Sequence, residues 1–240
     1  MSTQNDERRC VMQTIQIHEL EQNPQLYKNM AKTLHEDGIV CLPASNGYRL
    51  VANIFSLEAV VKILQIKRRT RKAPVLLFVP DQKSVNEVAA DVSPHAQMLM
   101  QQFWPGDLTL LFDAHNNIPK KVRKNLSLSQ IGVRIPRDPC MSQLVEAFGG
   151  PLLVTSANKA KKVGAHSEAQ IRKNFSQWLD ILVSAGDVKT QKPSNIVDVR
   201  GAAPTLRREG AIEFDQILQA WETLNPLPQT SSSEAIAASA

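Results

Sequence analysis

Short apolar runs bounded by turn residues alternate with longer amphipathic segments along most of this chain. Such runs are typical of buried strands, whereas longer segments with a period of about 3.6 residues favour helices. The expected strands are 38–42, 74–79, 108–113, 132–135, 152–155, 181–184 and 195–199. The expected helices are 23–37, 57–66, 84–90, 96–103, 141–148, 167–175 and 214–224. This alternation predicts an α/β protein.

The chain has 240 residues, of which 42% are hydrophobic, so it can bury a substantial core. It shows neither an internal repeat nor a long linker, which predicts a single domain over residues 13–224. Residues 1–12 are mostly polar, and residues 225–240 are rich in Pro, Ser and Ala without an apolar period. We therefore expect a flexible N-terminal arm and a disordered C-terminal tail.

Charge and cysteine usage narrow the class of protein. The formal net charge of +5 favours an anionic partner such as a nucleotide or RNA, although many ordinary enzymes carry a similar charge. Cys10, Cys41 and Cys140 lie far apart and form no zinc-like cluster, so we expect reduced thiols and no structural metal. No segment approaches the roughly 18 apolar residues of a membrane span, and the N-terminus has no apolar leader. We expect a cytoplasmic protein without a membrane partner.

A basic stretch, KRRTRK, occupies residues 67–72 between a predicted helix and a predicted strand. A junction of this kind often faces the cleft at a sheet edge, where Arg and Lys side chains suit a polyphosphate. The alternative is a solvated helix end, whose cations complement the negative end of the helix dipole. Composition alone leaves both interpretations open.

Several motifs then follow in a fixed order. They are Lys67-x-Arg69 with Pro74, PGDLTLLF at 105–112, VRIPRDP at 133–139 with GGPLLVTSAN at 149–158, and PSNIVDVR at 193–200 with RREGAI at 207–212. Together they resemble the YrdC/YciO family over roughly residues 14–214. The resemblance implies a single YrdC-like domain, in which a twisted, open mixed sheet is flanked by helices and bears a basic concave cleft.

The activity that this resemblance implies is that of an L-threonylcarbamoyladenylate synthase, a nucleotidyltransferase. Such an enzyme converts ATP, L-threonine and bicarbonate to threonylcarbamoyl-AMP and pyrophosphate, the first step of the t6A37 modification of tRNA. ATP is then a substrate and Mg²⁺ the cofactor. The proteins that transfer the threonylcarbamoyl group to tRNA are the expected downstream partners.

The resemblance also implies a catalytic tetrad of Lys67, Arg69, Ser156 and Asn158. Cations near the α-phosphate would stabilise the charge that develops as a carbamate attacks and pyrophosphate departs. Ser156 and Asn158 come just after a predicted strand, where a hydroxyl and an amide can bind ligand oxygens. The alternative for this pair is a turn in which both bond their own backbone.

Further positions match ligand-lining positions of the family. ATP binding is implied for Lys67, Arg69, Thr109, Asn158 and Arg208, and substrate binding for Ala44, Asn46, Tyr48, Arg134, Ser156 and Ser194, with no metal ligand among them. Two alternatives stay open here: Arg134 could form an ion pair with Asp138 or another acid, and Thr109 could simply fill a strand.

The chain departs from the family pattern at residues 43–50. The family signature P-T-[DE]-T-V-Y-G-L reads PASNGYRL here, so Ala44 and Asn46 replace the two Thr residues and Arg49 replaces the Gly. Loss of a hydroxyl that bonds a buried ligand group costs about 1 to 3 kcal/mol, which predicts poor use of threonine. Residues 46–48 are similar to the S-G-Y of the YciO branch. Lys159, Lys161 and Lys162 in SANKAKK, and Asn195 in place of a Thr, are further departures.

Two functions therefore stay open. The chain could adenylate a carbamoylated amino acid that is threonine or close to it. Alternatively, a YciO-like paralogue could bind nucleotide, tRNA or other double-stranded RNA through residues 67–72 and 159–162 without threonine-dependent turnover.

Overall fold

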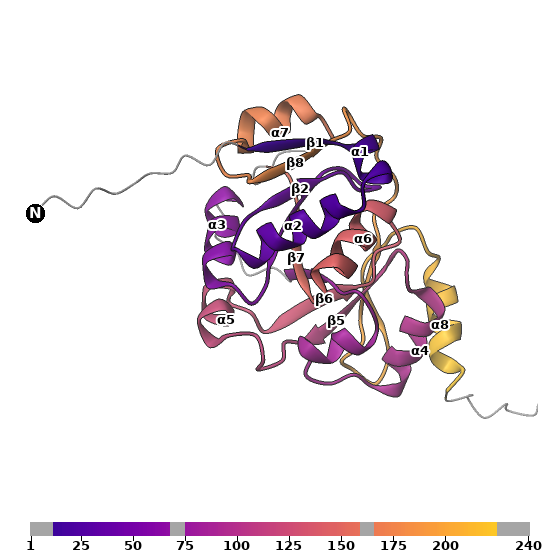
Figure 1. Ribbon diagram of the computed structural model, residues 1–240. Coiled ribbons are helices and arrows are strands. Elements are labelled where there is room, and N and C mark those ends of the chain that lie inside the picture. The colour runs from indigo at the N-terminus through magenta and orange to yellow at the C-terminus, as the bar shows by residue number, and fades with distance from the viewer. Residues whose placement is uncertain (1–11, 68–74, 159–165, 225–240) are drawn as a thin grey trace, which may run out of the picture.

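The computed structural model describes residues 12–67, 75–158 and 166–224 (Figure 1). Its strands form one open sheet in the order β1-β8-β2-β3-β7-β4-β6-β5-β9-β10. The strands are β1 (Gln13–Gln16), β2 (Val40–Leu42), β3 (Arg49–Asn53), β4 (Val75–Phe78), β5 (Leu108–Asp113), β6 (Gln130–Arg134), β7 (Leu152–Ser156), β8 (Ile181–Ser184), β9 (Asn195–Asp198) and β10 (Thr205–Arg208).

The sheet is mixed. β8 pairs in parallel with β1 and β2, β4 with β6, and β5 with β9. The pairs β2–β3, β3–β7, β4–β7, β5–β6 and β9–β10 are antiparallel. The predicted α/β fold with an open mixed sheet is therefore confirmed.

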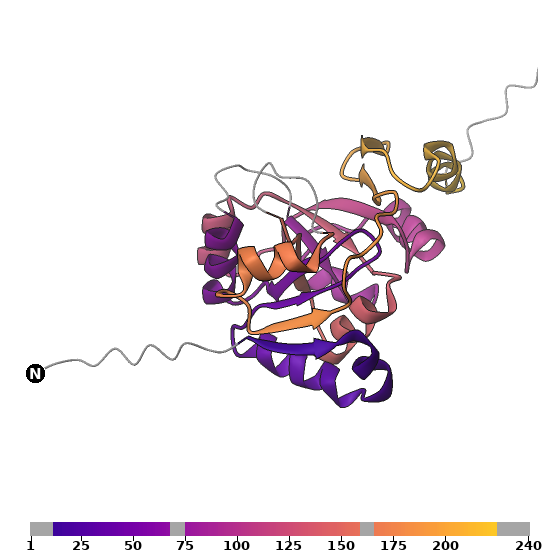
Figure 2. The same cartoon turned by 90° about the horizontal axis from the view of Figure 1, so that it is seen from above.

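Helices cover both faces of this sheet (Figures 1 and 2). They are α1 (Ile17–Gln22), α2 (Gln25–His35), α3 (Leu57–Lys67), α4 (Pro94–Phe103), α5 (Lys120–Leu126), α6 (Pro139–Phe148), α7 (Glu168–Phe175) and α8 (Phe214–Glu222). α2 and α6 pack on one face, while α3, α4, α5, α7 and α8 contribute to the core on the other. Alternate residues of a strand point to opposite faces, so Val51 joins the first core and Leu50 and Ala52 join the second.

The helix predicted at 84–90 is confirmed only in part, because the structure has a shorter 3₁₀ helix there, η1 (Lys83–Glu87). The Asp81 carboxylate accepts hydrogen bonds from the Ser84 backbone N–H (2.8 Å) and hydroxyl (3.0 Å), which favours a tight turn. The chain then leaves the helix so that Ala89 can form an antiparallel bridge with Ala114. The sequence prediction also missed β1, α1, β3, α5 and β10.

Several predicted features fall outside the described residues. The basic stretch beyond Lys67, including Arg69, belongs to 68–74, and the three lysines after SAN belong to 159–165. The predicted arm and tail also lie there, apart from Met12, which packs against the core. Among the described residues, no helix is long and apolar enough to cross a membrane.

Candidate functional site

A cavity of about 300 Å³ lies beside the start of α6, where the loop between β2 and β3 meets the ends of β4, β6 and β7. Its described lining is Ala44, Ser45, Asn46, Arg49, Leu76, Phe78, Asp107, Arg134, Arg137, Asp138, Met141, Ser156, Asn158, His166, Lys192, Ser194 and Arg208. Seven of the residues predicted to bind ligand are in this lining: Ala44, Asn46, Arg134, Ser156, Asn158, Ser194 and Arg208.

The strand register brings several of these side chains to the same part of the sheet. Arg49 on β3 stands directly opposite Ser156 on β7. Phe78 on β4 stands opposite Arg134 on β6, in a parallel pair. Opposite residues on adjacent strands have neighbouring side chains, so the sheet itself sets the spacing of these polar groups.

Lys67, Ser156 and Asn158 form a connected group. The Lys67 ammonium donates to the Ser156 carbonyl and to Oδ1 of Asn158, both at 2.7 Å, and to the Asn158 carbonyl. The Ser156 hydroxyl donates to the same Asn158 Oδ1 at 2.6 Å. The structure thus joins three members of the predicted tetrad, although Lys67 itself is not among the lining residues. The Asn158 backbone N–H also donates to the Ser156 carbonyl (2.9 Å).

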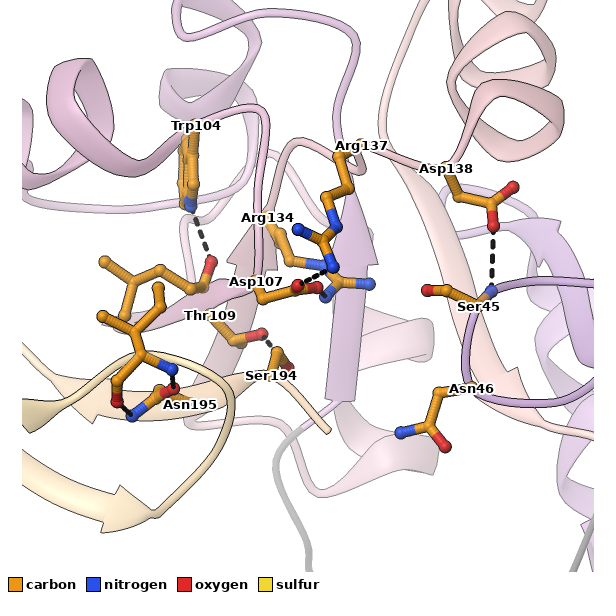
Figure 3. A network of polar contacts seen from close by, with 12 residues as sticks. Ser45, Asn46, Trp104, Asp107, Thr109, Arg134, Arg137, Asp138, Ser194 and Asn195 are labelled. Carbon is orange, nitrogen blue, oxygen red and sulfur yellow. Dashed lines mark hydrogen bonds and ion pairs between the residues drawn. The ribbon is translucent and has the colours of Figure 1, made fainter. Parts of the chain in front are cut away.

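Two arginines share one carboxylate at the centre of the site (Figure 3). Asp107 lies 3.3 Å from Nη1 of Arg134 and 2.6 Å from Nη2 of Arg137. The Arg134 guanidinium also stacks over the Phe78 ring, 4.7 Å from its centroid. Burial lowers the pKa of Arg134 to about 10, against the opposing effect of Asp107, so the side chain stays charged at neutral pH.

The ion pair considered as the alternative for Arg134 is present, but its partner is the buried Asp107 and not Asp138. The Asp138 carboxylate caps α6 by accepting the Met141 N–H (3.4 Å) and also accepts the Ser45 N–H at 2.8 Å. This second bond ties the loop between β2 and β3 to the start of α6, and Figure 3 shows Ser45 and Asp138 facing one another.

A third group joins β5, β9 and β10. The hydroxyls of Thr109 and Ser194 lie 3.1 Å apart, and Arg208 donates to the Ser194 carbonyl (2.8 Å) and hydroxyl (3.0 Å). Thr109 is buried behind Ser194 and is absent from the lining. The Asn195 side-chain amide donates to the Ile212 carbonyl (2.8 Å) and accepts the Ile212 N–H (2.9 Å) (Figure 3). Asn195, a departure from the family pattern, thus has a structural role.

Tyr48, like Thr109, is a predicted ligand-binding residue that is buried and absent from the cavity lining. Its hydroxyl donates to the Gly186 carbonyl (2.8 Å), accepts the Ala185 N–H (3.0 Å) and lies 3.3 Å from Glu168 Oε2. Burial raises the pKa of this phenol above its ordinary value of 10. Tyr48 thus contacts the β8–β9 connection, not the cavity.

The described lining is strongly cationic. Arg49, Arg134, Arg137, Lys192 and Arg208 outnumber its two carboxylates, Asp107 and Asp138. Within the described residues, the buried side-chain nitrogens that lack a hydrogen-bond partner are Arg49 Nε, Arg134 Nε and His166 Nδ1, and all three belong to this lining. Buried polar atoms are normally paired, so an anionic ligand with hydrogen-bond acceptors would complete the site.

Sequence reasoning missed several lining residues. Asp107, Arg137, His166 and Lys192 were assigned no role, and Asp138 was considered only as a partner of Arg134, although Asp107 lies in PGDLT and Arg137 and Asp138 lie in VRIPRDP. For Asp107, the available signal was an acid placed between a Pro-Gly pair and a predicted strand. No group of three or more His, Cys, Asp or Glu side chains that could hold a metal ion occurs in the described part of the chain.

Several threonylcarbamoyl-AMP synthases are similar in sequence to this chain. Threonylcarbamoyl-AMP synthase of Pyrococcus abyssi is 25% identical over 184 residues, which cover 77% of this chain but 54% of that protein. The chain thus spans about half the length of that relative. A putative threonylcarbamoyl-AMP synthase of Methanocaldococcus jannaschii is 29% identical, with 85% of this chain and 95% of the relative covered. The enzyme of Marinobacter nauticus is 30% identical, with 70% and 88% covered.

Solved structures share the fold. Sua5 of P. abyssi complexed with L-threonine matches with a TM-score of 0.76 at 23% identity, covering 88% of this chain and 60% of that one. YciO of E. coli matches with a TM-score of 0.73 at 22% identity, covering 86% and 100%. A family model for Sua5, YciO and YrdC proteins, described as "Telomere recombination", matches residues 32–210. This match extends over well more than half of the sequence, and the chain therefore belongs to the Sua5/YciO/YrdC family.

Proposed function

We propose that this protein is a nucleotidyltransferase of the threonylcarbamoyl-AMP synthase type, acting in the cytoplasm in the t6A37 modification of tRNA. Its substrates would be ATP, bicarbonate and an amino acid of which L-threonine is the family's example. The observation that carries the proposal is the group of Lys67, Ser156 and Asn158 at the edge of a cation-rich cavity. Curated relatives named threonylcarbamoyl-AMP synthase support the same reaction.

The reaction needs an environment that stabilises negative charge. The amino group and bicarbonate first form a carbamate with loss of water. A carbamate oxygen then attacks the α-phosphorus of ATP, the bond from that phosphorus to the α–β bridging oxygen breaks, and pyrophosphate leaves with the electron pair. Charge grows on the phosphoryl oxygens, which favours preorganised cations. Lys67 and Arg69 would provide them, and Ser194 and Arg208 would hold the nucleotide and the substrate in place, with Thr109 positioning the Ser194 hydroxyl.

Magnesium would enter with the nucleotide. The two carboxylates of the cavity are already engaged, Asp107 by two arginines and Asp138 by two backbone N–H groups. These residues do not form a metal site, whereas Mg²⁺ is commonly carried by substrate phosphates and water. The ion would thus be part of the MgATP substrate.

Pyrophosphate release tests this proposal. The wild type is incubated with MgATP, bicarbonate and each amino acid in turn, and ATP binding is measured separately by calorimetry. Lys67→Ala should weaken ATP binding by about 1.5 to 3 kcal/mol, since a charge-assisted contact is lost. Lys121→Ala, an exposed lysine on α5 outside the cavity, is the matched control and should change nothing.

The outcome that contradicts the proposal is ATP binding without amino-acid-dependent pyrophosphate release. Tight binding of tRNA or double-stranded RNA under the same conditions would then favour the binding paralogue. Equal effects of Lys67→Ala and Lys121→Ala would indicate a diffuse electrostatic surface instead of a defined phosphate site.

A further inference from the structure

Tyr48 bonds two walls of the cavity without lining it. Its carbonyl accepts the Ala157 N–H at 2.8 Å, in the middle of the turn that carries Ser156 and Asn158. Both of those residues line the cavity, whereas Tyr48 itself is 0% exposed and packs in the core. The main chain of Tyr48 thus holds the wall formed by this turn.

The phenol of Tyr48 holds the connection that follows β8. Its hydroxyl donates to the Gly186 carbonyl (2.8 Å) and accepts the Ala185 N–H (3.0 Å). Burial raises the pKa of Tyr48, so the hydroxyl keeps its proton and remains a donor at neutral pH. Gly186 adopts a left-handed φ of 67°, which glycine tolerates best. The hydroxyl thus fixes the backbone at the point where the chain turns away from β8.

The segment fixed in this way is bonded to the wall that carries His166. The Gly186 N–H donates to Glu168 Oε2 (2.8 Å), and the Val188 N–H donates to the His166 carbonyl (2.9 Å). The Asp187 carboxylate accepts the Glu168 N–H (3.0 Å) at the start of α7. These three hydrogen bonds tie the two segments together, so that a shift of one would move the other.

His166 has the features of a ligand contact. It lines the cavity, and its Nδ1 is buried without a hydrogen-bond partner among the described residues. Buried polar atoms are normally paired, so a bound ligand is the expected partner. The place of Nδ1 depends on the backbone of His166, whose carbonyl is held by Val188. Tyr48 is therefore connected to this contact through the segment that its hydroxyl fixes.

We propose that Tyr48 is a positioning residue, which fixes the turn at the end of β7 relative to His166, and that His166 contacts the bound ligand through Nδ1. The inference rests on the proposed function and adds two residues to it. The hydroxyl is needed only for the second wall, because the main chain holds the first. Ala185 is half-buried and Gly186 is exposed, so water can replace the hydroxyl there. Its loss should shift this wall without unfolding the protein.

Calorimetry on the full chain tests the inference with Tyr48→Phe, which keeps the ring and the main-chain bond and removes the hydroxyl. The ligands titrated are a non-hydrolysable ATP analogue and, in its presence, L-threonine. We expect the affinity for at least one of them to fall by roughly three- to tenfold, no more than the value of one hydrogen bond. Tyr27→Phe removes a buried phenol hydroxyl from α2, outside the cavity lining, and should change neither affinity. Thermal unfolding verifies that each variant is folded.

A double-mutant cycle with His166→Ala separates positioning from a general loss of structure. His166→Ala should weaken the same ligand, because the contact with Nδ1 is removed. In the His166→Ala background, Tyr48→Phe should lose most of its effect on affinity, since the group that it positions is absent. A structural effect on the whole cavity would persist in that background, and the two losses of binding free energy would add.

Unchanged affinity for both ligands in Tyr48→Phe, an equal loss in Tyr27→Phe, or additive effects in the cycle would each overturn the inference. Coupled losses of affinity without amino-acid-dependent pyrophosphate release would uphold it while contradicting the proposed function. Pyrophosphate release by the wild type, with ligand affinities that Tyr48→Phe leaves intact, would support the proposed function and overturn the inference. A wild type that binds neither ligand would contradict both.

Discussion

At the scale of single residues, Asp107 controls the geometry of the cavity. It is buried and holds Arg134, whose side chain is 13% exposed, and Arg137, whose side chain is 55% exposed. A buried ion pair that loses one partner leaves an uncompensated charge, whereas an exposed pair contributes little. The buried charge of Arg134 thus needs the carboxylate of Asp107 to compensate it, whereas the charge of Arg137 is solvated by water.

Asp107→Asn should therefore lower the free energy of unfolding by about 3 kcal/mol, because Arg134 would keep its charge among other cations. Urea unfolding monitored by circular dichroism measures this change. Arg137→Gln is the comparison, and it should cost less than about 1 kcal/mol since that arginine is largely exposed. Equal losses from the two variants would contradict the assignment of Arg134 as the dependent partner.

The residues that replace hydroxyls in the loop before β3 allow a second test. Ala44→Thr combined with Asn46→Thr should raise threonine-dependent pyrophosphate release by roughly tenfold, the value of about one recovered hydrogen bond. A bond that strengthens in the transition state would raise kcat, and one made equally in the ground state would lower KM. Full threonine activity in the wild type would show that another group already supplies this contact.

At the scale of elements, Glu168 joins α7 to β8 and to the connection that follows β8. Its carboxylate accepts hydrogen bonds from Arg172 on its own helix, from Ser184 on β8 (2.8 and 2.9 Å) and from the Gly186 N–H (2.8 Å). Burial alone would raise the pKa of Glu168, but these bonds together bring it below its ordinary 4.5. The ionised carboxylate is thus the form that stabilises the fold.

This pKa shift has a definite sign for stability. Because the pKa is lower in the folded state, the stabilisation is present above pH 4.5 and is lost as the pH falls through the folded-state pKa. Glu168→Gln should lower the free energy of unfolding at pH 7 and flatten its decline below pH 4.5. Urea unfolding across this range measures both effects. The control is Glu58→Gln, in a surface pair whose Glu is 66% exposed, and an equal response there would contradict the role of Glu168.

Three of the elements that the sequence did not reveal, β1, α5 and β10, share a physical reason. β1 buries one residue, Ile15, and β10 buries none, so neither presents an apolar run. α5 is mostly cationic and buries only Val122 and Leu126. In contrast, β5 and β8 were predicted at their observed ends because nearly every residue in them is buried. Strands held mainly by sheet pairing leave little trace in local hydrophobicity.

The candidate site follows the same rule. Ser156 and Asn158 stand within one short motif, and their link to Lys67 could be anticipated from the family resemblance. The roles of Asp107 and Asp138 depend on contacts between segments far apart in the chain, with Arg134 in one case and Ser45 in the other. These segments come together only through the order of the strands in the sheet, which cannot be predicted from the local sequence pattern of any one segment.

At the scale of the whole molecule, the net charge and the cavity predict different kinds of binding. A charge of +5 spread over the surface attracts any polyanion, whereas the cavity offers a limited set of cations in a lining of defined shape. Ionic strength separates the two, because each neutralised nucleic-acid phosphate releases counterions and adds to the salt dependence. The affinity of an enzyme that binds MgATP in this cavity should therefore depend only weakly on salt concentration.

We expect ATP affinity to fall by less than about tenfold between 50 and 200 mM salt, since few phosphates are contacted. A surface that bound six to ten RNA phosphates would lose on the order of 10³ to 10⁵ in affinity over the same range. Calorimetry measures the affinity for ATP and filter binding measures the affinity for tRNA, each across this range of salt. The slope of log affinity against log salt concentration is then compared between the two ligands. Lys67→Ala should weaken ATP binding at every salt concentration and leave the tRNA slope unchanged, because Lys67 bonds Ser156 and Asn158 at the cavity edge. Salt-resistant binding of a defined RNA without ATP would instead indicate that RNA is the ligand for which this cavity is built.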